Sequence, residues 1–179
     1  LVESLSKPSD DILERLVFKR RDSNVYLVAD AYRGSRMRQT INDFFDAVSG
    51  KSRENIKVKD VTLQNAGGSD LVAFLGHNGL MDFKLDRQIE NEDETSRDAV
   101  VLACASRNYF FKPLKDARAT PLVWTTNLMA PEAYILHDAL DGWVLNEKPE
   151  QIRERAAAAY AKYQKIGLNA AKNLLVTGF

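Results

Sequence analysis

Two reactive side chains each follow a short apolar run in this sequence. His77 comes directly after LVAFLG at positions 71–76, and Cys104 comes directly after VVLA at positions 100–103. The chain has one cysteine and two histidines, so its whole supply of thiols is in this pattern. A thiol beside an imidazole can be activated by it, and the thiolate is the nucleophilic form. The pattern therefore predicts a histidine–cysteine dyad.

Both apolar runs have the length and composition of buried β-strands. The 26 residues between His77 and Cys104 suffice for a crossover connection between parallel strands. If the two strands are neighbours, their ends lie one strand spacing apart, about 5 Å. In open α/β sheets the functional residues gather beyond the carboxyl ends of the strands. We therefore expect His77 and Cys104 to share one edge of a sheet.

The rest of the chain alternates strand-like and helical patterns, which indicates one α/β domain over residues 1–179. We expect a largely parallel central sheet with helices on both faces. The segment 82–98 is rich in carboxylates and is expected to be a solvated loop. The expected helices are a short one from Ser9 or Asp10 to Leu16, one over 37–48 with Gly50 past its end, one opened by Pro131, and one long helix over 149–174. The further expected strands are 24–32, 56–64 and 120–126.

Composition excludes several classes of function. Hydrophobic residues make up 45% of the 179 residues, which is typical of a folded globular domain. Lysine plus arginine and aspartate plus glutamate each number 25, so the net charge is zero. A neutral chain has no overall attraction to nucleic acid or to an anionic membrane, so we expect neither partner. No apolar run approaches the roughly 18 residues that span a bilayer, and a single cysteine allows no internal disulfide.

The two blocks LVAFLGHNG and VVLACAS resemble those of the caspase-like (clan CD) cysteine peptidases. In that family a hydrophobic strand ends in Gly-His and a following strand ends in Ala-Cys-x-Ser. The resemblance covers residues 24–126, and the chain also resembles a group of bacterial proteins with GHNGLMDF and VVLAC-S blocks. It implies a three-layer caspase-like fold and a cysteine hydrolase, an endopeptidase, in which His77 and Cys104 form the catalytic dyad.

The resemblance also implies the remaining parts of the site. The backbone N–H groups of Asn78, Gly79 and Cys104 are expected to hold the oxyanion. The family usually has glycine directly after the histidine, where this chain has Asn78. We expect the substrate cleft to be lined by residues at the strand ends and in the loops beside them: Asp30, Asp82, Arg107, Asn108, Trp124, Thr125 and Thr126. The expected partner is a peptide or protein substrate, with neither a metal nor a cofactor.

Two expectations concern what lies outside the site. The caspase-like order places a strand and a helix upstream of residue 24, and the 23 preceding residues leave little room for them. We therefore expect a sheet edge that a homodimer partner or an upstream segment covers. The chain begins at Leu1 without methionine, so we expect a processed or truncated product, and the compartment is left open. The alternative function is a catalytically inactive module of the same fold that binds a partner through the strand-end cleft.

Overall fold

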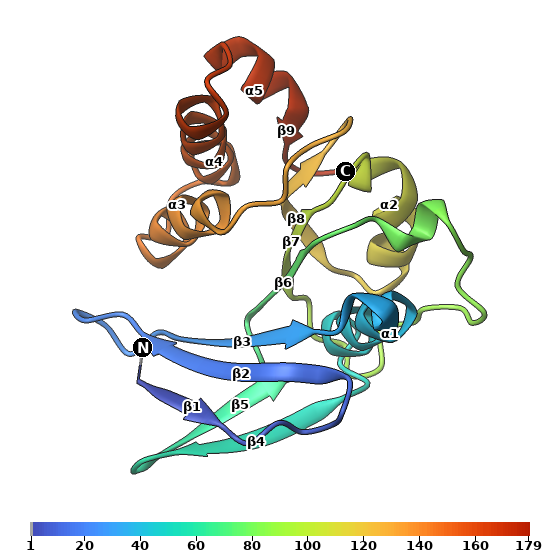
Figure 1. Ribbon diagram of the computed structural model, residues 1–179, viewed down its shortest axis with the longest axis vertical. Coiled ribbons are helices and arrows are strands. Elements are labelled where there is room, and N and C mark those ends of the chain that lie inside the picture. Colours follow the sequence, from blue (N-terminus) through green and yellow to red (C-terminus); the bar gives the residue numbers. More distant parts are fainter. Residues whose placement is uncertain (1) are drawn as a thin grey trace.

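Three parallel strands form the centre of the molecule. Residues 2–179 are described by the computed structural model, which is a mixed α/β structure (Figure 1). β6 (Leu71–Leu75), β7 (Asp98–Leu102) and β8 (Thr120–Thr125) run parallel, and β9 (Leu175–Val176) pairs antiparallel with β8. The predicted strands at 71–75, 99–103 and 120–126 are therefore confirmed, as is a mostly parallel sheet.

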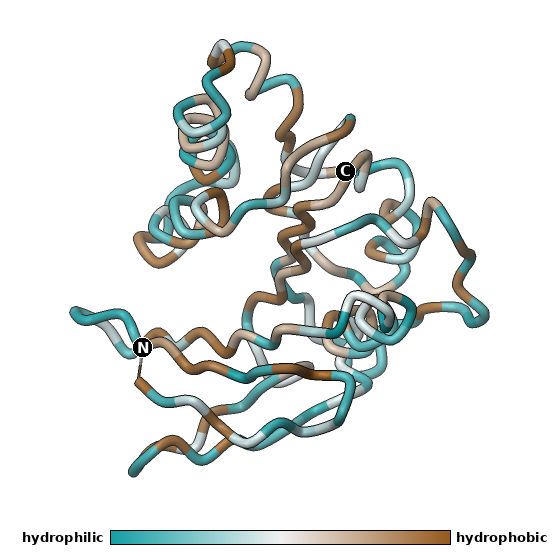
Figure 2. The backbone as a smooth tube through the Cα atoms, viewed as in Figure 1, coloured by the Kyte–Doolittle hydropathy of each residue, from teal (hydrophilic) through white to brown (hydrophobic). Residues whose placement is uncertain are grey.

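Helices cover both faces of this sheet, as expected. Along β7 the side chains alternate: Val101 faces the layer of α1 (Met37–Val48) and α2 (Ser106–Asp116), and Val100 and Leu102 face the opposite layer. That opposite layer consists of α3 (Ala133–Val144), α4 (Pro149–Gln164) and α5 (Leu168–Leu174). A strand covered on both faces needs a nearly continuous apolar sequence, and Figure 2 shows the central strands as the most hydrophobic part of the chain.

The N-terminal third forms two small antiparallel sheets instead of part of the parallel one (Figure 1). β1 (Glu3–Leu5), β2 (Ile12–Lys19) and β3 (Tyr26–Tyr32) form one sheet, and β4 (Arg53–Val58) and β5 (Val61–Ala66) form a hairpin. The two share an apolar cluster that includes Val17, Ile56 and Val58. The predicted helix ending at Leu16 is therefore wrong, since that segment is β2, and the strand predicted over 56–64 is a hairpin. The strand at 24–32 exists as β3, but its side chains are only half-buried.

Three helical predictions also need correction. The helix over 37–48 is confirmed as α1, but the long helix over 149–174 is interrupted. Lys165 adopts a left-handed conformation (φ 54°) that ends α4, and α5 begins three residues later. Pro131 lies outside α3, whose first residue is Ala133. The sequence patterns did not predict α2, which begins two residues after Cys104. Two short 3-10 helices, η1 (Gly34–Arg36) and η2 (Gly79–Met81), complete the chain.

A buried arginine anchors the long loop that leads into β7. The side chain of Arg97 is 2% exposed, and it pairs with Asp93 and donates to the backbone oxygen of Gly67. Asp93 also pairs with Arg53 on β4, so one carboxylate joins the loop to the β4–β5 hairpin. Apart from the start of β7 at Asp98, the segment 82–98 has no regular structure, as predicted, but within it Arg97 is buried and Asp93 is partly buried.

The Asp93 carboxylate makes the stability of the fold dependent on pH. The hydrogen bond from Arg97 first, and then those from Arg53 and from the Thr95 backbone N–H, hold the pKa of Asp93 well below its usual range, although burial opposes them. A carboxyl group whose pKa is lowered by folding stabilises the folded state above its unfolded pKa, about 3.9, and this contribution is lost as the pH falls towards the folded pKa.

We therefore predict that Asp93→Asn lowers the free energy of unfolding by about 3 kcal/mol at pH 7, because it leaves the Arg97 guanidinium buried without its anion. The variant should also lose less stability than the wild type between about pH 5 and pH 2. Urea denaturation across this range measures both effects. Asp86→Asn, at an exposed acid of the same loop, is the control and should keep the wild-type dependence. Equal slopes for all three proteins would contradict the prediction.

Gly50 occupies a position that no other residue fits well. Its φ is +81°, and a Cβ atom there would lie 2.6 Å from Oδ1 of Asp93. That carboxylate is held by two arginines, so it cannot move aside without breaking an ion pair. We predict that Gly50→Ala lowers the free energy of unfolding by about 2 kcal/mol or more, from the left-handed conformation together with the clash. Gly34→Ala, where no atom lies within 4 Å of the added Cβ, should change stability little. Thermal or urea denaturation of the two variants checks the difference.

Candidate active site

The ladder between β6 and β7 brings the two predicted reactive residues to the same sheet edge. The strands are parallel neighbours, and Leu75 is opposite Leu102. His77 lies two residues after Leu75, and Cys104 lies two residues after Leu102. The expectation that the two strands are adjacent, with their carboxyl ends together, is therefore confirmed.

A buried amide side chain connects the two strand ends. Asn78 is fully buried, its Nδ2 donates to the backbone oxygen of Cys104 at 2.7 Å, and its Oδ1 accepts from the Leu80 backbone N–H at 3.1 Å. A buried amide that satisfies both its donor and its acceptor has one stable orientation. Asn78 therefore fixes the loop that carries His77 against the turn that carries Cys104. Sequence reasoning assigned Asn78 only a backbone role, because its place between His77 and Gly79, after the apolar run, gives no sign that its side chain is buried.

Cys104 lies on a tight turn from β7 into α2. The next residue, Ala105, has left-handed dihedral angles (φ 48°, ψ 34°), and α2 begins at Ser106. A non-glycine residue in this conformation is strained and persists where its surroundings hold it. Here Ser106 Oγ donates to the oxygen of Val101 at 2.9 Å and accepts from the backbone N–H of Thr125 at 2.9 Å. This network fixes the turn to the ends of β7 and β8, and the sequence patterns did not predict it.

The imidazole of His77 is oriented by a carboxylate and is open to solvent. Its Nε2 lies 2.5 Å from Oδ2 of Asp82, and the two side chains are 55% and 63% exposed. Asp82 was predicted to lie near the site, and the structure places it against the histidine ring. Occupation of Nε2 leaves Nδ1 as the ring nitrogen that can serve another partner.

The sulfur of Cys104 contacts the loop that follows β8. The Met129 backbone N–H donates to Sγ at 3.4 Å, and Sγ donates to the Met129 backbone oxygen at 3.6 Å. The cysteine is partly exposed. Within residues 2–179 no hydrogen bond joins His77 to Cys104, so in this state the two groups are neighbours with separate partners.

The predicted oxyanion donors divide into two groups. The backbone N–H of Gly79 donates to the His77 carbonyl oxygen at 3.0 Å and is therefore occupied. In the described part of the chain the backbone N–H groups of Asn78 and Cys104 donate to no backbone carbonyl. Asn78 is fully buried, however, so the N–H group of the partly exposed Cys104 is the one of the three that can bind a developing negative charge.

The structure brings only some of the predicted cleft residues to this edge. Arg107 and Asn108 lie on the first turn of α2, and Asn108 is exposed. Trp124 and Thr125 are fully buried, so they lie beneath the surface at the strand ends and do not line a cleft. The Trp124 ring packs against Phe111.

Two other predicted cleft residues are engaged elsewhere. Thr126 is exposed, and its Oγ1 donates to the Asn173 backbone oxygen at the end of α5. Asp30 lies on β3, in a different sheet, where it forms a two-point ion pair with the buried Arg15. This pair is the main cause that raises the pKa of Arg15 above its ordinary value. Asp30 therefore has a structural role, because β3 does not belong to the parallel sheet.

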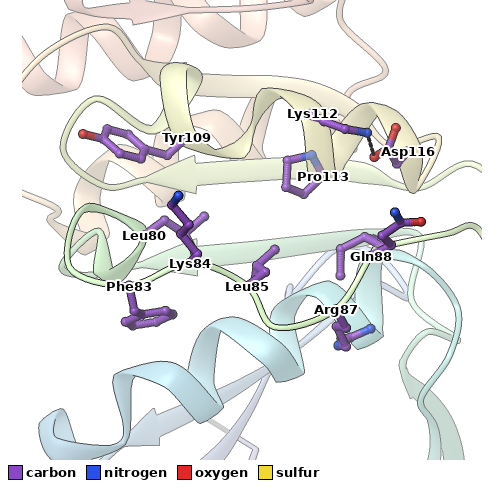
Figure 3. A pocket seen from close by; sticks show the side chains of 11 residues that line it. Leu80, Phe83, Lys84, Leu85, Arg87, Gln88, Tyr109, Lys112, Pro113 and Asp116 are labelled. Carbon is purple, nitrogen blue, oxygen red and sulfur yellow. Dashed lines mark hydrogen bonds and ion pairs between the residues drawn. The ribbon is translucent and has the colours of Figure 1, made fainter.

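Two hollows in the surface lie away from the reactive pair. One, of about 300 Å³, lies between the loop 80–89 and α2, with Leu80 and Phe83 on one wall and Tyr109 and Pro113 on the other (Figure 3). The second, of about 390 Å³, lies at the opposite end of the strands and is lined by Arg97 among others. Neither is lined by His77 or Cys104, so these two residues lie outside both hollows.

One group of side chains in residues 2–179 has the composition of a metal site. His137, Asp138 and Asp141 lie close together on α3. All three are at the surface, and Asp141 already pairs with a cation, Arg20, which directly follows β2. His77, Cys104 and Asp82 do not belong to this group. None of the helices in the described residues is long and apolar enough to cross a membrane.

Comparison with known proteins adds no relative to this description. No protein-family model matches the chain, and neither a curated protein nor a solved structure matches it. The functional interpretation therefore rests on the geometry of the site.

The role of Asn78 leads to a prediction. Asn78→Ala leaves the buried oxygen of Cys104 and the Leu80 N–H without their partner, and we expect it to lower the free energy of unfolding by about 1–3 kcal/mol. It should also change the rate of Cys104 alkylation under native conditions, because the turn is no longer fixed. Asn108→Ala, at an exposed asparagine near the same cysteine, should change neither quantity. Urea denaturation and iodoacetamide labelling followed by mass spectrometry measure the two effects, and a wild-type alkylation rate in Asn78→Ala would argue against a positioning role.

Proposed function

We propose that the chain is a caspase-like cysteine hydrolase, an endopeptidase, that acts through His77 and Cys104. The observation that supports this most strongly is the register of β6 and β7, since it places a histidine and the only cysteine two residues beyond an opposed pair, Leu75 and Leu102. Asn78 further holds the two loops together. A proximity that arises from the strand ladder does not depend on flexible loops.

The proposed reaction uses only groups described above. The Cys104 thiolate attacks the carbonyl carbon of the scissile peptide bond, and a C–S bond forms while the oxygen becomes negatively charged. The N–H group of Cys104 binds that oxygen. His77, oriented by Asp82, protonates the leaving amine as the C–N bond breaks. Water then attacks the thioester carbon, the C–S bond breaks, and the acid product and the thiol are released.

The thiol must leave its present partner before this reaction can start. Sγ is held by the backbone of Met129, and no bond links it to the imidazole of His77. Catalytic hydrogen bonds are often long in the free enzyme and tighten when substrate binds. We therefore infer that a substrate displaces the loop at Met129 from the sulfur.

A second candidate function is favoured by the same contacts. Because Sγ of Cys104 and Nε2 of His77 each contact another group, and no hydrogen bond joins the two residues, the fold is also compatible with a non-catalytic module that binds a partner at this edge. The two functions differ in one property, the dependence of thiol reactivity on the histidine.

We predict that Cys104 reacts with iodoacetamide at pH 6 at least about fivefold faster in the wild type than in His77→Ala, because an imidazole that accepts the thiol proton keeps a larger fraction as thiolate. His137→Ala removes the other histidine, which lies on α3, and should leave the rate unchanged. Asp82→Asn should give an intermediate rate, since the ring keeps its position less well.

Hydrolysis itself is tested with a mixed peptide library and mass spectrometry of the products. Cleavage by the wild type that disappears in Cys104→Ala and in His77→Ala would support the endopeptidase. A thiol whose rate ignores His77, together with an uncleaved library, would reject it in favour of the binding module.

A further inference from the structure

The outer edge of β6 is an unfilled position in the sheet. β6 pairs with β7 on one side and with no strand on the other. At the two ends of the ladder, the Asp70 carbonyl accepts from Asp98 and the Gly76 N–H donates to Leu102. In a strand the N–H and C=O of one residue point to the same side, and successive residues alternate. Alternate residues from Asp70 to Gly76 therefore face β7.

The residues between them face away from the sheet. By this alternation Leu71, Ala73 and Leu75 direct their backbone N–H and C=O groups outward. Among residues 2–179 none of these groups has a backbone or side-chain hydrogen-bond partner. Three donors and three acceptors, spaced for an extended chain, therefore line the edge, and a row of this kind is a template for another strand.

The partial exposure of the β6 side chains indicates that no other segment of the described chain covers this edge in place of a strand. In β7 and β8 every residue after the first is buried. In β6 only Phe74 is buried, and the other four residues are partly exposed. β7 and α1 are the elements that pack most closely against β6, and α1 covers its face and not its edge.

We propose that an extended polypeptide segment docks on this edge as an additional strand, paired with Leu71, Ala73 and Leu75. The occupant would lie between the same two apolar layers as β6, whose Val72 faces α1 and whose Leu71 and Leu75 face the layer of α3 and α4. A strand in such a position needs apolar side chains at consecutive positions. The preferred segment is therefore short, extended and rich in valine and isoleucine.

The direction of β6 connects this docking edge to the candidate active site. β6 ends at Leu75, and His77 follows two residues later with an exposed side chain. A chain that lies along β6 therefore runs up to the loops that carry His77 and Cys104. The choice of a substrate polypeptide as the occupant rests on the proposed function, whereas the docking itself needs no reactive thiol. Main-chain pairing supplies affinity without a deep cavity, and the two hollows described above lie elsewhere.

Amide hydrogen exchange on the Cys104→Ala variant tests the docking. The probe is a capped heptapeptide with the sequence Lys-Thr-Val-Ile-Val-Thr-Lys, added in excess. We expect the amides of Leu71, Ala73 and Leu75 to exchange at least about tenfold more slowly with the peptide, because they gain acceptors. The amides of Val72 and Phe74 already face β7 and should not change.

Two matched peptides control for non-specific binding. One is N-methylated at alternate amides and the other at the remaining amides, so that only one of them can pair with β6. Protection by one methylated peptide and not by the other would support strand addition.

Three results would overturn the proposal. The first is that Leu71, Ala73 and Leu75 are as protected as Val72 and Phe74 in the free protein. The second is that no peptide changes their exchange. The third is protection that rises with protein concentration alone, which would identify a second copy as the occupant. Docking without cleavage by the wild-type protein would instead reject the proposed hydrolase and leave the docking edge in place.

Discussion

The hydrogen-bonded ladder between β6 and β7 determines where every side chain of the candidate site stands. Because the strands are parallel and Leu75 is opposite Leu102, the two chains leave the sheet side by side and in the same direction. The contacts of the loops that follow β6 and β7 refine positions that the ladder already fixes. The Asn78 amide closes the gap between the two loops, and Ser106 and Thr125 join the second loop to the next strand. A site built in this way depends on the burial of β7 more than on any loop.

Buried charge has a comparable role at the other end of the molecule. Arg97 links the long loop before β7 to the β4–β5 hairpin, and Arg15 links β2 to β3 and to Glu54 of β4. Each guanidinium is nearly inaccessible and is paired with carboxylates. Removal of one partner from such a pair is costly, because the remaining charge stays buried. The two small sheets are therefore held to each other by Arg15 and their modest apolar cluster, and the ion pairs of Asp93 with Arg53 and Arg97 hold the β4–β5 hairpin to the loop before β7.

The parts of the fold that sequence reasoning predicted are those in which one periodicity extends over a whole element. The helical spacing of Ile41, Phe44 and Phe45 indicated α1, and the apolar runs indicated β6, β7 and β8. Two of the failures occur where a residue other than glycine adopts left-handed dihedral angles. Lys59 turns the β4–β5 hairpin and Lys165 ends α4, both with positive φ. A lysine in the sequence does not indicate such a conformation. The β4–β5 hairpin therefore resembled a single strand, and α4 and α5 resembled a single helix.

The candidate site was predictable to a similar degree and for a similar reason. The ends of two apolar strands identified His77 and Cys104, but the side chains that connect the loops act across the sheet. Thr125 illustrates the limit, because a polar residue at a strand end resembles a cleft residue and here is fully buried beneath the turn. The membership of Asp30 in a separate sheet was also hidden, since the pattern of β3 is that of a strand in any sheet.

The two borders of the central sheet are unlike each other. On the far side of β8 the border is β9, which has two residues, and beyond it the backbone N–H of Gly178 still donates to Pro121. A strand of that length offers too few main-chain groups to seat a further strand. The central sheet can therefore accept a further strand at β6 and not at β9. Growth of this sheet is one-sided, and the strand that pairs with β6 becomes its new border.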